Sequence, residues 1–235
     1  FITDYNEDGS IDSRVKANTT TGFSIVSYEG SGANATVGHG LGAVPSWIIV
    51  KDRDGVQNWV VYHNGINSDG NQYLELNSTQ GTQSSSVFWN STAPTSSLFS
   101  VGTSNSVSGR NFIAYCWSEK SAYSKFGSFT GTGANLDITL GFRAGWVMIK
   151  RTDSTDNWYI FDSSRDPFGM TRSLYADVTS SEGDSSTRSV TVDSDGMIIG
   201  SNSNINASGG TFIYMAFAGS YSDFITDVNT TGSIT

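Results

Sequence analysis

The stretch P-S-W-I-I-V-K-D-R-D-G-V-Q-N-W-V-V-Y at residues 45–62 returns at residues 144–161 as A-G-W-V-M-I-K-R-T-D-S-T-D-N-W-Y-I-F. Each copy has an apolar run, a polar turn that contains Asp with Gly or Ser, and a second run that opens on Asn-Trp. Two β-prone runs joined by a short turn-forming segment predict a β-hairpin. Identities 99 positions apart indicate a duplication inside the chain; they are Trp47, Lys51, Asp54, Asn58 and Trp59, which recur as Trp146, Lys150, Asp153, Asn157 and Trp158.

The composition agrees with a β-rich chain. Charged residues make up 15% of the 235 positions and aromatic residues 12%, with 26 glycines and only three prolines. This profile is typical of an all-β protein with many short strands and polar turns. Since the length suffices for two domains of about 100 residues, the duplication predicts two tandem homologous β-sandwich domains of jelly-roll-like type.

The repeat also sets the expected boundaries. We expect an N-terminal arm or linker at residues 1–21, one sandwich repeat at 22–120, a second at 121–220, and a C-terminal arm at 221–235. No convincing amphipathic helix is present in either repeat. Besides the hairpins, we expect strands at residues 23–28, 72–76, 87–90, 98–101 and 111–117, and at 123–129, 173–176, 189–192, 197–200 and 211–217.

The two ends of the chain carry the same motif. Residues 1–12 read F-I-T-D-Y-N-E-D-G-S-I-D and residues 224–235 read F-I-T-D-V-N-T-T-G-S-I-T, so eight of the twelve positions agree. Phe224 and Ile225 are expected to pack on the domain before them. Phe1 and Ile2 are expected to dock on the second domain of a neighbouring copy, which predicts self-association into a head-to-tail fibre.

Charge and cysteine usage exclude several classes of protein. The net charge is −9 and no basic cluster is present, whereas a nucleic-acid groove needs clustered Lys and Arg against phosphate. No apolar run approaches the 18 residues of a membrane-spanning helix, so no membrane insertion is expected. Cys116 is the single cysteine, which gives neither a disulfide framework nor a metal site.

A metal loop is one candidate site. Asp4, Asn6, Asp8 and Asp12 lie in D-x-N-x-D-G-S-I-D, which matches the first nine positions of an EF-hand-type calcium loop. Position twelve of that loop should be a bidentate Glu, but here it is Val15. We favour an Asx-rich turn and expect no cofactor, with Ca²⁺ as the alternative.

The residues do not favour an enzyme. The two histidines, His39 and His63, each have a different residue at the matching position of the second repeat. Neither a G-x-S-x-G nucleophile elbow nor an HExxH motif occurs. Asp162, Arg165 and Asp166 in D-S-S-R-D-P fit a salt-bridged loop better than an acid–base pair. We therefore predict no catalysis.

Glycan binding is the third candidate chemistry, because aromatic rings stack on sugar faces beside polar groups. Trp89 has no aromatic counterpart in the second repeat, which makes it the candidate for an exposed ring. The loop residues His63 and Arg165 are the next candidates. The four tryptophans that recur are expected to fill the core between two sheets; they are Trp47, Trp59, Trp146 and Trp158.

Three segments carry a family resemblance: G-S-I-D-S-R-V-K-A-N-T-T-T-G-F-S-I-V-S-Y at residues 9–28, G-A-N-A-T-V-G-H-G-L-G-A-V-P at 32–45, and W-V-M-I-K-R-T-D-S-T-D-N-W-Y-I-F-D-S-S-R-D-P-F at 146–168. They resemble an uncharacterised repeat domain of tail-fibre and other structural proteins of tailed phages, especially marine phages and cyanophages. The resemblance implies a virion appendage or extracellular setting, repeated modules and contact with host surface glycans, and it supplies no catalytic residues. The alternatives are a repeat unit of a cellular extracellular fibre or adhesin and, third, a glycan-degrading appendage.

Overall fold

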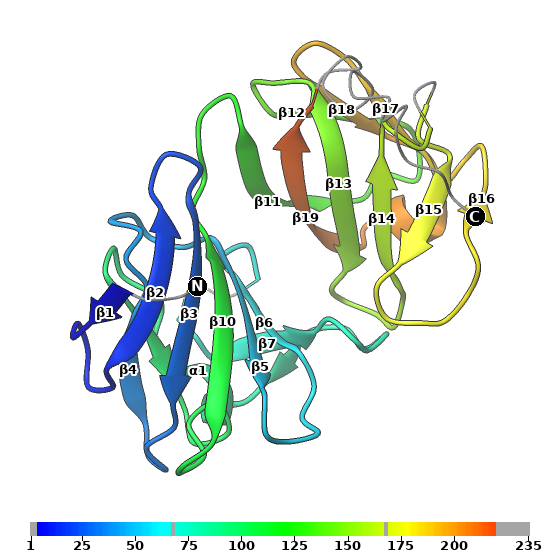
Figure 1. Cartoon of the computed structure of the whole chain (residues 1–235). Helices are drawn as coiled ribbons and strands as arrows, with labels where there is room; N and C mark the ends of the chain where they lie inside the picture. Colours follow the sequence, from blue (N-terminus) through cyan, green and yellow to red (C-terminus); the bar gives the residue numbers. More distant parts are fainter. Residues whose placement is uncertain (1–3, 67–68, 167–168, 220–235) are drawn as a thin grey trace, which may run out of the picture.

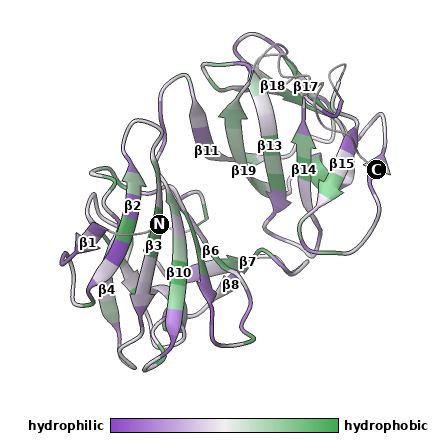
Figure 2. Ribbon diagram, viewed as in Figure 1, coloured by the Kyte–Doolittle hydropathy of each residue, from purple (hydrophilic) through white to green (hydrophobic). Residues whose placement is uncertain are grey.

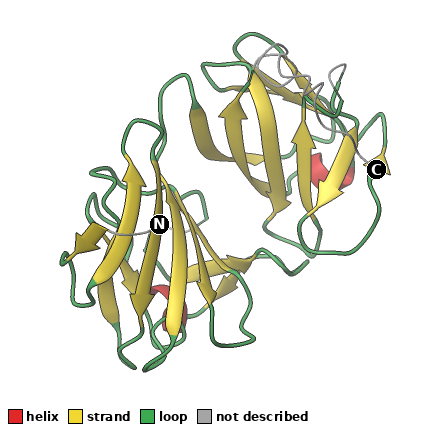
Figure 3. Ribbon diagram, in the orientation of Figure 1, coloured by secondary structure: helices red, strands yellow, loops and turns green. Residues whose placement is uncertain are grey.

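The computed structural model describes residues 4–66, 69–166 and 169–219. Strands make up 45% of the chain and helices 4%, so the predicted all-β class is confirmed. The paired strands run antiparallel. Figure 1 and Figure 3 show them grouped in two parts of the molecule, which we call the first half (residues 4–118) and the second half (residues 119–219).

The first half contains an eight-stranded sheet and a two-stranded sheet. The large sheet has the order β1-β2-β3-β10-β5-β6-β7-β8, and the small sheet pairs β4 with β9. The bounds are β1 Asp4–Asn6, β2 Ser13–Asn18, β3 Phe23–Glu29, β4 Ala35–Gly38, β5 Trp47–Asp52, β6 Val60–His63, β7 Gln72–Glu75, β8 Gln83–Ser84, α1 Ser86–Trp89, β9 Leu98–Val101 and β10 Asn111–Trp117.

The second half contains a six-stranded sheet of order β11-β19-β13-β14-β15-β16 and a three-stranded sheet of order β12-β18-β17. From β3 to β8, the large sheet of the first half visits its strands in the same order as this six-stranded sheet. The bounds are β11 Ser124–Thr130, β12 Leu136–Thr139, β13 Ala144–Arg151, β14 Trp158–Asp162, β15 Arg172–Tyr175, β16 Gly183–Asp184, β17 Val190–Val192, β18 Gly196–Ile199, α2 Ser203–Asn206 and β19 Thr211–Ala218.

Both predicted hairpins are present, and a lysine closes each of them in the same way. β5 pairs with β6, and β13 pairs with β14. The Lys51 ammonium donates to the Gln57 carbonyl at 2.5 Å, and the Lys150 ammonium donates to the Asp156 carbonyl at 2.5 Å. A lysine at the end of the first strand therefore satisfies the backbone oxygens of the turn that follows it, which explains why it recurs in both copies.

Each half has a hydrophobic core between its large and its small sheet. In the first half Val37 and Phe99 of the small sheet pack with Ile48 and Phe112 of the large sheet. In the second half Met197 and Ile199 occupy the corresponding place, packed against side chains such as Val147. Each small sheet therefore covers one face of its large sheet.

A third core lies between the two halves, and the recurring tryptophans belong to it. Trp47 and Trp158 are fully buried there, with ring centroids 5.9 Å apart. Trp59 and Trp146 are half-buried at its margin. The expectation that these rings fill the core between the two sheets of one repeat is therefore wrong. Alternate residues of a strand point to opposite faces, and these rings point to the face opposite the small sheet.

The packing of strand β5 explains the unbroken apolar run at residues 47–50. Ile48 and Val50 face the core of the first half, whereas Trp47 and Ile49 face the core between the halves. A strand covered on both faces needs apolar residues at every position instead of alternate ones. In the second half the strand β19, which pairs on both sides, is largely hydrophobic (Figure 2), whereas the edge strand β11 mixes polar residues with two phenylalanines.

Residues 4–18 are part of the fold, although the sequence indicated a polar arm. β1 and β2 extend the large sheet beyond β3. Ser13 and Val15 are buried, while Arg14 and Lys16 are exposed. An edge strand with one solvated face needs only one apolar row, so its composition resembles that of a linker.

Residues 87–90 form the end of the helical turn α1 instead of the expected strand. The Ser85 hydroxyl accepts a hydrogen bond from the Val87 amide, which caps the first turn. Asn90 ends the turn in the left-handed conformation at φ 51, which Asn tolerates better than most residues. These capping residues outweigh the β preference of the intervening apolar side chains.

The burial of the recurring tryptophans predicts unequal stability losses. Trp158→Ala should lower the free energy of unfolding by about 3–5 kcal/mol, the usual cost of removing a fully buried large side chain. Trp59→Ala, the matched change at a half-buried ring, should cost roughly half of that. Urea denaturation followed by circular dichroism measures both. Equal losses, or a loss below about 1 kcal/mol for Trp158→Ala, would contradict this assignment of the core.

Candidate functional site

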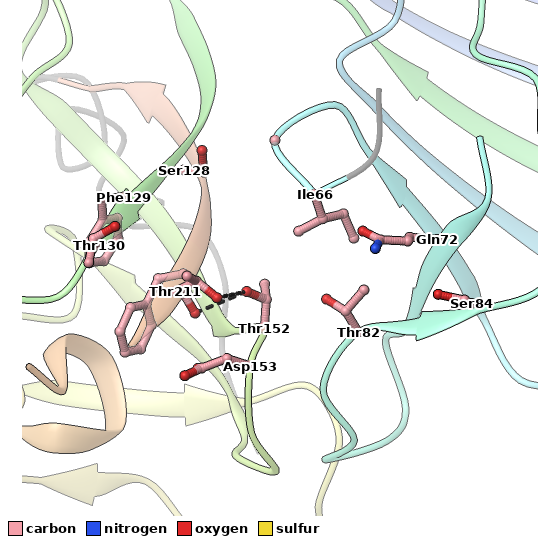
Figure 4. A pocket seen from close by; sticks show the side chains of 12 residues that line it. Ile66, Gln72, Thr82, Ser84, Ser128, Phe129, Thr130, Thr152, Asp153 and Thr211 are labelled. Atoms are coloured by element: carbon pink, nitrogen blue, oxygen red, sulfur yellow. Dashed lines mark hydrogen bonds between the residues drawn. The ribbon is translucent and has the colours of Figure 1, made fainter. Parts of the chain in front are cut away.

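A polar cleft opens between the two halves (Figure 4), with a volume of ≈ 730 Å³. Ile66, Gln72, Thr82 and Ser84 come from the first half, and the facing wall comes from the second half. Side chains from both halves are thus needed to form it. The lining residues of the second half are Ser128, Phe129, Thr130, Thr152, Asp153, Thr211 and Phe212.

Hydrogen bonds between the halves fix the spacing of the cleft walls. The Thr82 amide donates to the Thr152 carbonyl at 2.7 Å, and the Lys150 ammonium donates to the Thr79 carbonyl at 2.9 Å. The Trp158 indole nitrogen donates to the Glu75 carbonyl at 2.9 Å. Burial lowers the pKa of Lys150 to about 8, so at neutral pH the amine is still mostly charged and able to donate.

The lining of the cleft is suited to a polyhydroxyl ligand, but it offers fewer rings than the second candidate surface described below. The hydroxyls of Thr82, Ser84, Ser128 and Thr130 make no hydrogen bond to another described residue. The Asp153 carboxylate is held by Arg151 at 2.8 Å, and this hydrogen bond lowers the Asp153 pKa. The Phe212 ring is fully buried. The Phe129 ring, which also lines the cleft, is half-buried. A ligand in the cleft would therefore be held mainly by hydrogen bonds, with one aromatic ring beside it.

The outer face of the large sheet in the first half carries a second candidate surface. Phe23 on β3, Tyr115 and Trp117 on β10, and Trp59 just before β6 are half-buried; we call these four rings the aromatic shelf. β3 and β10 are neighbouring strands (Figure 1), and Phe23 pairs with Trp117 in their register. One side of each ring packs on the margin of the core between the halves or on a neighbouring ring.

The rings of the aromatic shelf are close to parallel. The Phe23 and Tyr115 planes differ by 3° at a centroid distance of 6.5 Å. The planes of Trp59 and Tyr115 differ by 22°, and those of Tyr115 and Trp117 by 28°. The largest difference, 31°, is between Phe23 and Trp117, whose centroids are 5.0 Å apart. The sheet therefore holds four ring planes in a common orientation.

Polar groups border the aromatic shelf on the side of β2. A pocket of ≈ 350 Å³ joins Phe23 and Ile25 with Lys16, Asn18 and Thr19. The Lys16 ammonium is exposed and makes no hydrogen bond to another described residue. The Asn18 side-chain oxygen accepts from the Thr20 amide at 3.0 Å, which leaves the Asn18 amide group available to donate. Ring planes and hydrogen-bond donors thus meet at one place.

The second half does not repeat the aromatic shelf. Ser124 pairs with Phe217 where Phe23 pairs with Trp117, so one ring is missing. The counterpart of Trp59 is Trp158, which is fully buried against the first half. The same face of the two sheets therefore serves for packing in the second half and remains partly open in the first.

Trp89, the residue expected to present an exposed ring, is 1% exposed. It lies on α1 inside the first core and packs edge-on against Tyr62 at a centroid distance of 5.8 Å. The expectation of exposure is therefore wrong, because the helical turn directs this ring inward. The lack of an aromatic counterpart to Trp89 in the second repeat therefore reflects a difference between the cores of the two halves.

His63 lies in the core between the halves and not on an open loop. Its ring is fully buried and meets the Trp47 ring edge-on at 4.9 Å. The Gly65 amide donates to its Nδ1 atom at 2.8 Å. Burial lowers the pKa of His63 to about 3, so the ring is neutral at physiological pH and is not available to a ligand.

Arg165 belongs to a salt-bridged loop, as the sequence indicated. Its Nε atom lies 2.5 Å from an oxygen of Asp162, and its Nη1 atom bonds Glu182. The nearby Asp166 carboxylate accepts from the Thr171 amide at 2.7 Å. The charged groups of this loop are therefore held by ion pairs and hydrogen bonds within it.

The residues of the calcium-loop candidate lie around the turn between β1 and β2. The Asn6 side-chain oxygen accepts from the Asp8 amide at 2.8 Å, which is an Asx turn. Asp12 is exposed. Within the described ranges, no group of three or more His, Cys, Asp or Glu side chains is arranged to hold a metal ion. The expectation of no cofactor, with Ca²⁺ as the alternative, stays a prediction.

The assembly residues Phe1, Ile2, Phe224 and Ile225 lie outside the described residues. None of the helices that the structure describes is long and apolar enough to cross a membrane. Cys116 is buried in the first core, as expected for an apolar environment, and burial raises its pKa strongly.

Sequence reasoning missed the aromatic shelf, although a signal for it was present. In G-F-S-I-V-S-Y, Phe23 and Ile25 alternate with buried residues, and in A-Y-C-W Tyr115 and Trp117 do the same. Period-two alternation places each pair on one face of a strand. Which face remains open could not be read from the pattern, because that depends on where the second half packs.

The buried His63 predicts a pH dependence of stability. In the unfolded chain the ring takes up a proton below its ordinary pKa of 6.5, whereas the folded ring resists protonation down to about 3. The contribution of His63 is therefore complete above pH 6.5 and is lost as the pH falls, by up to about 1.4 kcal/mol per pH unit. His39 has a lowered pKa from burial and acts in the same direction.

His63→Asn isolates this effect, since the Asn oxygen can accept from the Gly65 amide. The variant should be less stable at every pH, but its unfolding free energy should fall less steeply between pH 6.5 and 5 than that of the parent. Urea denaturation across this range measures the two slopes. Parallel slopes would contradict the burial of a neutral imidazole at position 63.

Comparison with known families gives a match. Residues 3–220 match the family described as Domain of unknown function (DUF7483). A comparison with curated proteins and one with solved structures found no match. The family match spans nearly the whole chain and includes both halves and the cleft between them. The chain therefore belongs to the DUF7483 family.

Proposed function

We propose that this chain is a structural and adhesive module of a surface appendage, and that it contacts surface glycans through the aromatic shelf. The observation that carries the proposal is the set of four half-buried, nearly parallel rings of Phe23, Trp59, Tyr115 and Trp117 on one sheet face. Half-buried aromatic rings at the margin of a core are among the groups that protein surfaces use for binding.

A sugar ring suits this surface better than other ligands. Its C–H face can lie on a ring plane while its hydroxyls accept from donors at the margin. Lys16 and Asn18 are such donors, and they line the pocket that contains Phe23. The rings stand on neighbouring strands of a sheet, so little conformational entropy is lost when they bind.

The module is proposed to consist of two tandem homologous domains of β-sandwich, jelly-roll-like type. Three observations support this: the common hairpin, the common order of strands in the large sheets, and a core between a large and a small sheet in each half. Successive strands that pair through hairpins and longer crossovers are typical of such folds.

The resemblance to tail-fibre repeats supports a setting on a virion appendage of a tailed phage. A repeat unit of a cellular fibre or adhesin is the alternative, and the same surface would serve it. In either setting the chain is expected to self-associate through its matching end motifs. The proposal assigns binding and no catalysis, since the carboxylate that lines the cleft is already paired with Arg151.

Binding of the purified chain to a panel of cell-surface and capsular glycans tests the proposal. Trp117→Ala should weaken binding of any retained glycan at least about tenfold, since it removes a stacking plane. Trp146→Ala, a half-buried tryptophan outside the aromatic shelf, is the matched control and should leave the affinity within about twofold of the parent. The recovered glycan should be chemically unchanged.

The cleft supplies the competing location. The double variant Thr82→Val, Ser128→Ala removes two of its free hydroxyls without touching the aromatic shelf. Loss of binding in this variant with full binding in Trp117→Ala would contradict the proposal. So would a panel in which no glycan binds. Electron microscopy of the native assembly distinguishes a phage particle from a cellular fibre.

A further inference from the structure

The register of three neighbouring strands places polar side chains beside the aromatic shelf (Figure 1). Lys16 on β2 pairs with Ile25 on β3, and Ile25 pairs with Tyr115 on β10. In the next row Asn18 on β2 pairs with Phe23 on β3. Residues paired in this way point to the same face of a sheet. Each row therefore begins with a polar group on β2 and continues with apolar side chains.

The pocket at this place lies where the two rows meet. Its volume is ≈ 350 Å³, and both rows contribute to its lining. Ile25 and Phe23 are half-buried, whereas Lys16 and Asn18 are exposed. Because neighbouring strands lie about 4.8 Å apart, a single sugar unit placed over Ile25 is within reach of the polar groups on β2 and of the ring beside them.

Lys16 brings to this pocket a positive charge that no described residue neutralises. None of the ion pairs between described residues includes Lys16. The described residues that line the pocket include no acidic side chain. A lysine ammonium is a compact point charge with three donors, and it bonds most strongly to an acceptor that is itself charged. The free partner of Lys16 is therefore best supplied by an anionic group of a ligand.

A second lysine flanks the rings, and the carboxylate beside it is engaged elsewhere. A Cβ on Gly22, the residue before Phe23, would lie 2.9 Å from the Cε atom of Lys120, so the Lys120 stem lies against the start of β3. The ion pairs between described residues do not include Lys120. The Glu119 carboxylate accepts from the Phe126 amide on β11 at 3.0 Å. Both lysines that flank Phe23 thus keep their charge unpaired.

The acidic character of the whole chain does not oppose an anionic ligand here. The net charge is −9, but at physiological ionic strength charges more than about 8 Å away are largely screened. On the same face Asp12 and Glu29 line a separate pocket with Arg14. Glu29 lies four residues from Ile25 along β3, which is about 13 Å. Local charge therefore favours an anionic group at the Lys16 end of β2.

We propose that the aromatic shelf selects acidic saccharides, with one sugar unit over Ile25 and its carboxylate or sulfate group on the Lys16 ammonium. This inference rests on the glycan binding proposed above and names the class of glycan. The Asn18 amide group donates to a hydroxyl of the same unit, and the Phe23 ring lies against its C–H face. A neutral glycan keeps the stacking contacts and lacks the ion pair.

Matched pairs of polysaccharides test this selectivity. Polygalacturonate and its methyl ester share a backbone and differ in the charge of the carboxylate, and dextran sulfate and dextran differ in sulfate in the same way. The acidic member of at least one pair should bind about fivefold more tightly than the neutral member, as expected for a favourable exposed ion pair. The pair that shows the gain identifies the anionic group. Each acidic glycan retained from the panel is compared with its esterified or desulfated form.

Substitutions at Lys16 test the assigned contact. Lys16→Gln should weaken binding of the acidic polymer about fivefold and leave binding of the neutral polymer within about twofold, whereas Lys16→Arg should keep the preference. Lys125→Gln is the matched control, because it removes a lysine whose ammonium donates to the Thr139 carbonyl in the second half. Raising the salt from roughly 50 to 500 mM should weaken acidic binding more in the parent than in Lys16→Gln.

The outcomes separate this inference from the function on which it rests. Equal binding of acidic and neutral members, lost in Trp117→Ala, overturns the acidic preference and leaves glycan binding by the aromatic shelf in place. Parent-like affinity and salt dependence of Lys16→Gln toward the acidic polymer also overturn it, as does a panel that retains only neutral glycans. Binding of no probe and of no panel glycan overturns the proposed function and this inference together.

Discussion

The contact between Trp47 and Trp158 in the core between the halves is the interaction on which the rest of the arrangement depends. Each ring stands on the face of a large sheet opposite its small sheet, so the two halves share a layer that neither could bury alone. The burial of this layer explains the unbroken apolar runs in both hairpins. The buried His63 lies in the same layer. The layer also holds the walls of the cleft together, because the Trp158 indole nitrogen donates to the Glu75 carbonyl of the first half.

The duplication produced two similar sheets whose outer faces have diverged. In the second half that face is filled by residues such as Met215 and Phe126, which pack on the first half. In the first half only β5, β6 and β7 are covered, and β10 and β3 keep their rings at the surface. A ring set on a rigid sheet beside a packed interface is held in place without loops. The proposed glycan surface is thus the uncovered remainder of the face that joins the halves.

Much of the fold could be predicted from the sequence, since period-two patterns, turn residues and an internal repeat are local signals. The hairpins and the all-β class followed from them. The strand expected at residues 87–90 was wrong because the capping side chains of Ser85 and Asn90 decided the local structure. Trp89 was misplaced because the same helical turn directs its ring into the first core. His63 was misplaced for another reason: whether a ring on a strand is exposed depends on the partner surface, which local sequence does not encode. The aromatic shelf could not be predicted for the same reason.

The edges of the two large sheets bear on the proposed fibre. In the first half β2 and β1 cover the edge of β3, whereas in the second half β11 is the last strand of its sheet among the described residues. An uncovered strand edge offers unpaired backbone groups to another chain. The two large sheets thus end on different strands, β1 in the first half and β11 in the second, so association through these ends joins unlike surfaces. A contact between unlike surfaces that does not close on itself continues as an open filament, and this asymmetry is what a head-to-tail assembly of such copies requires.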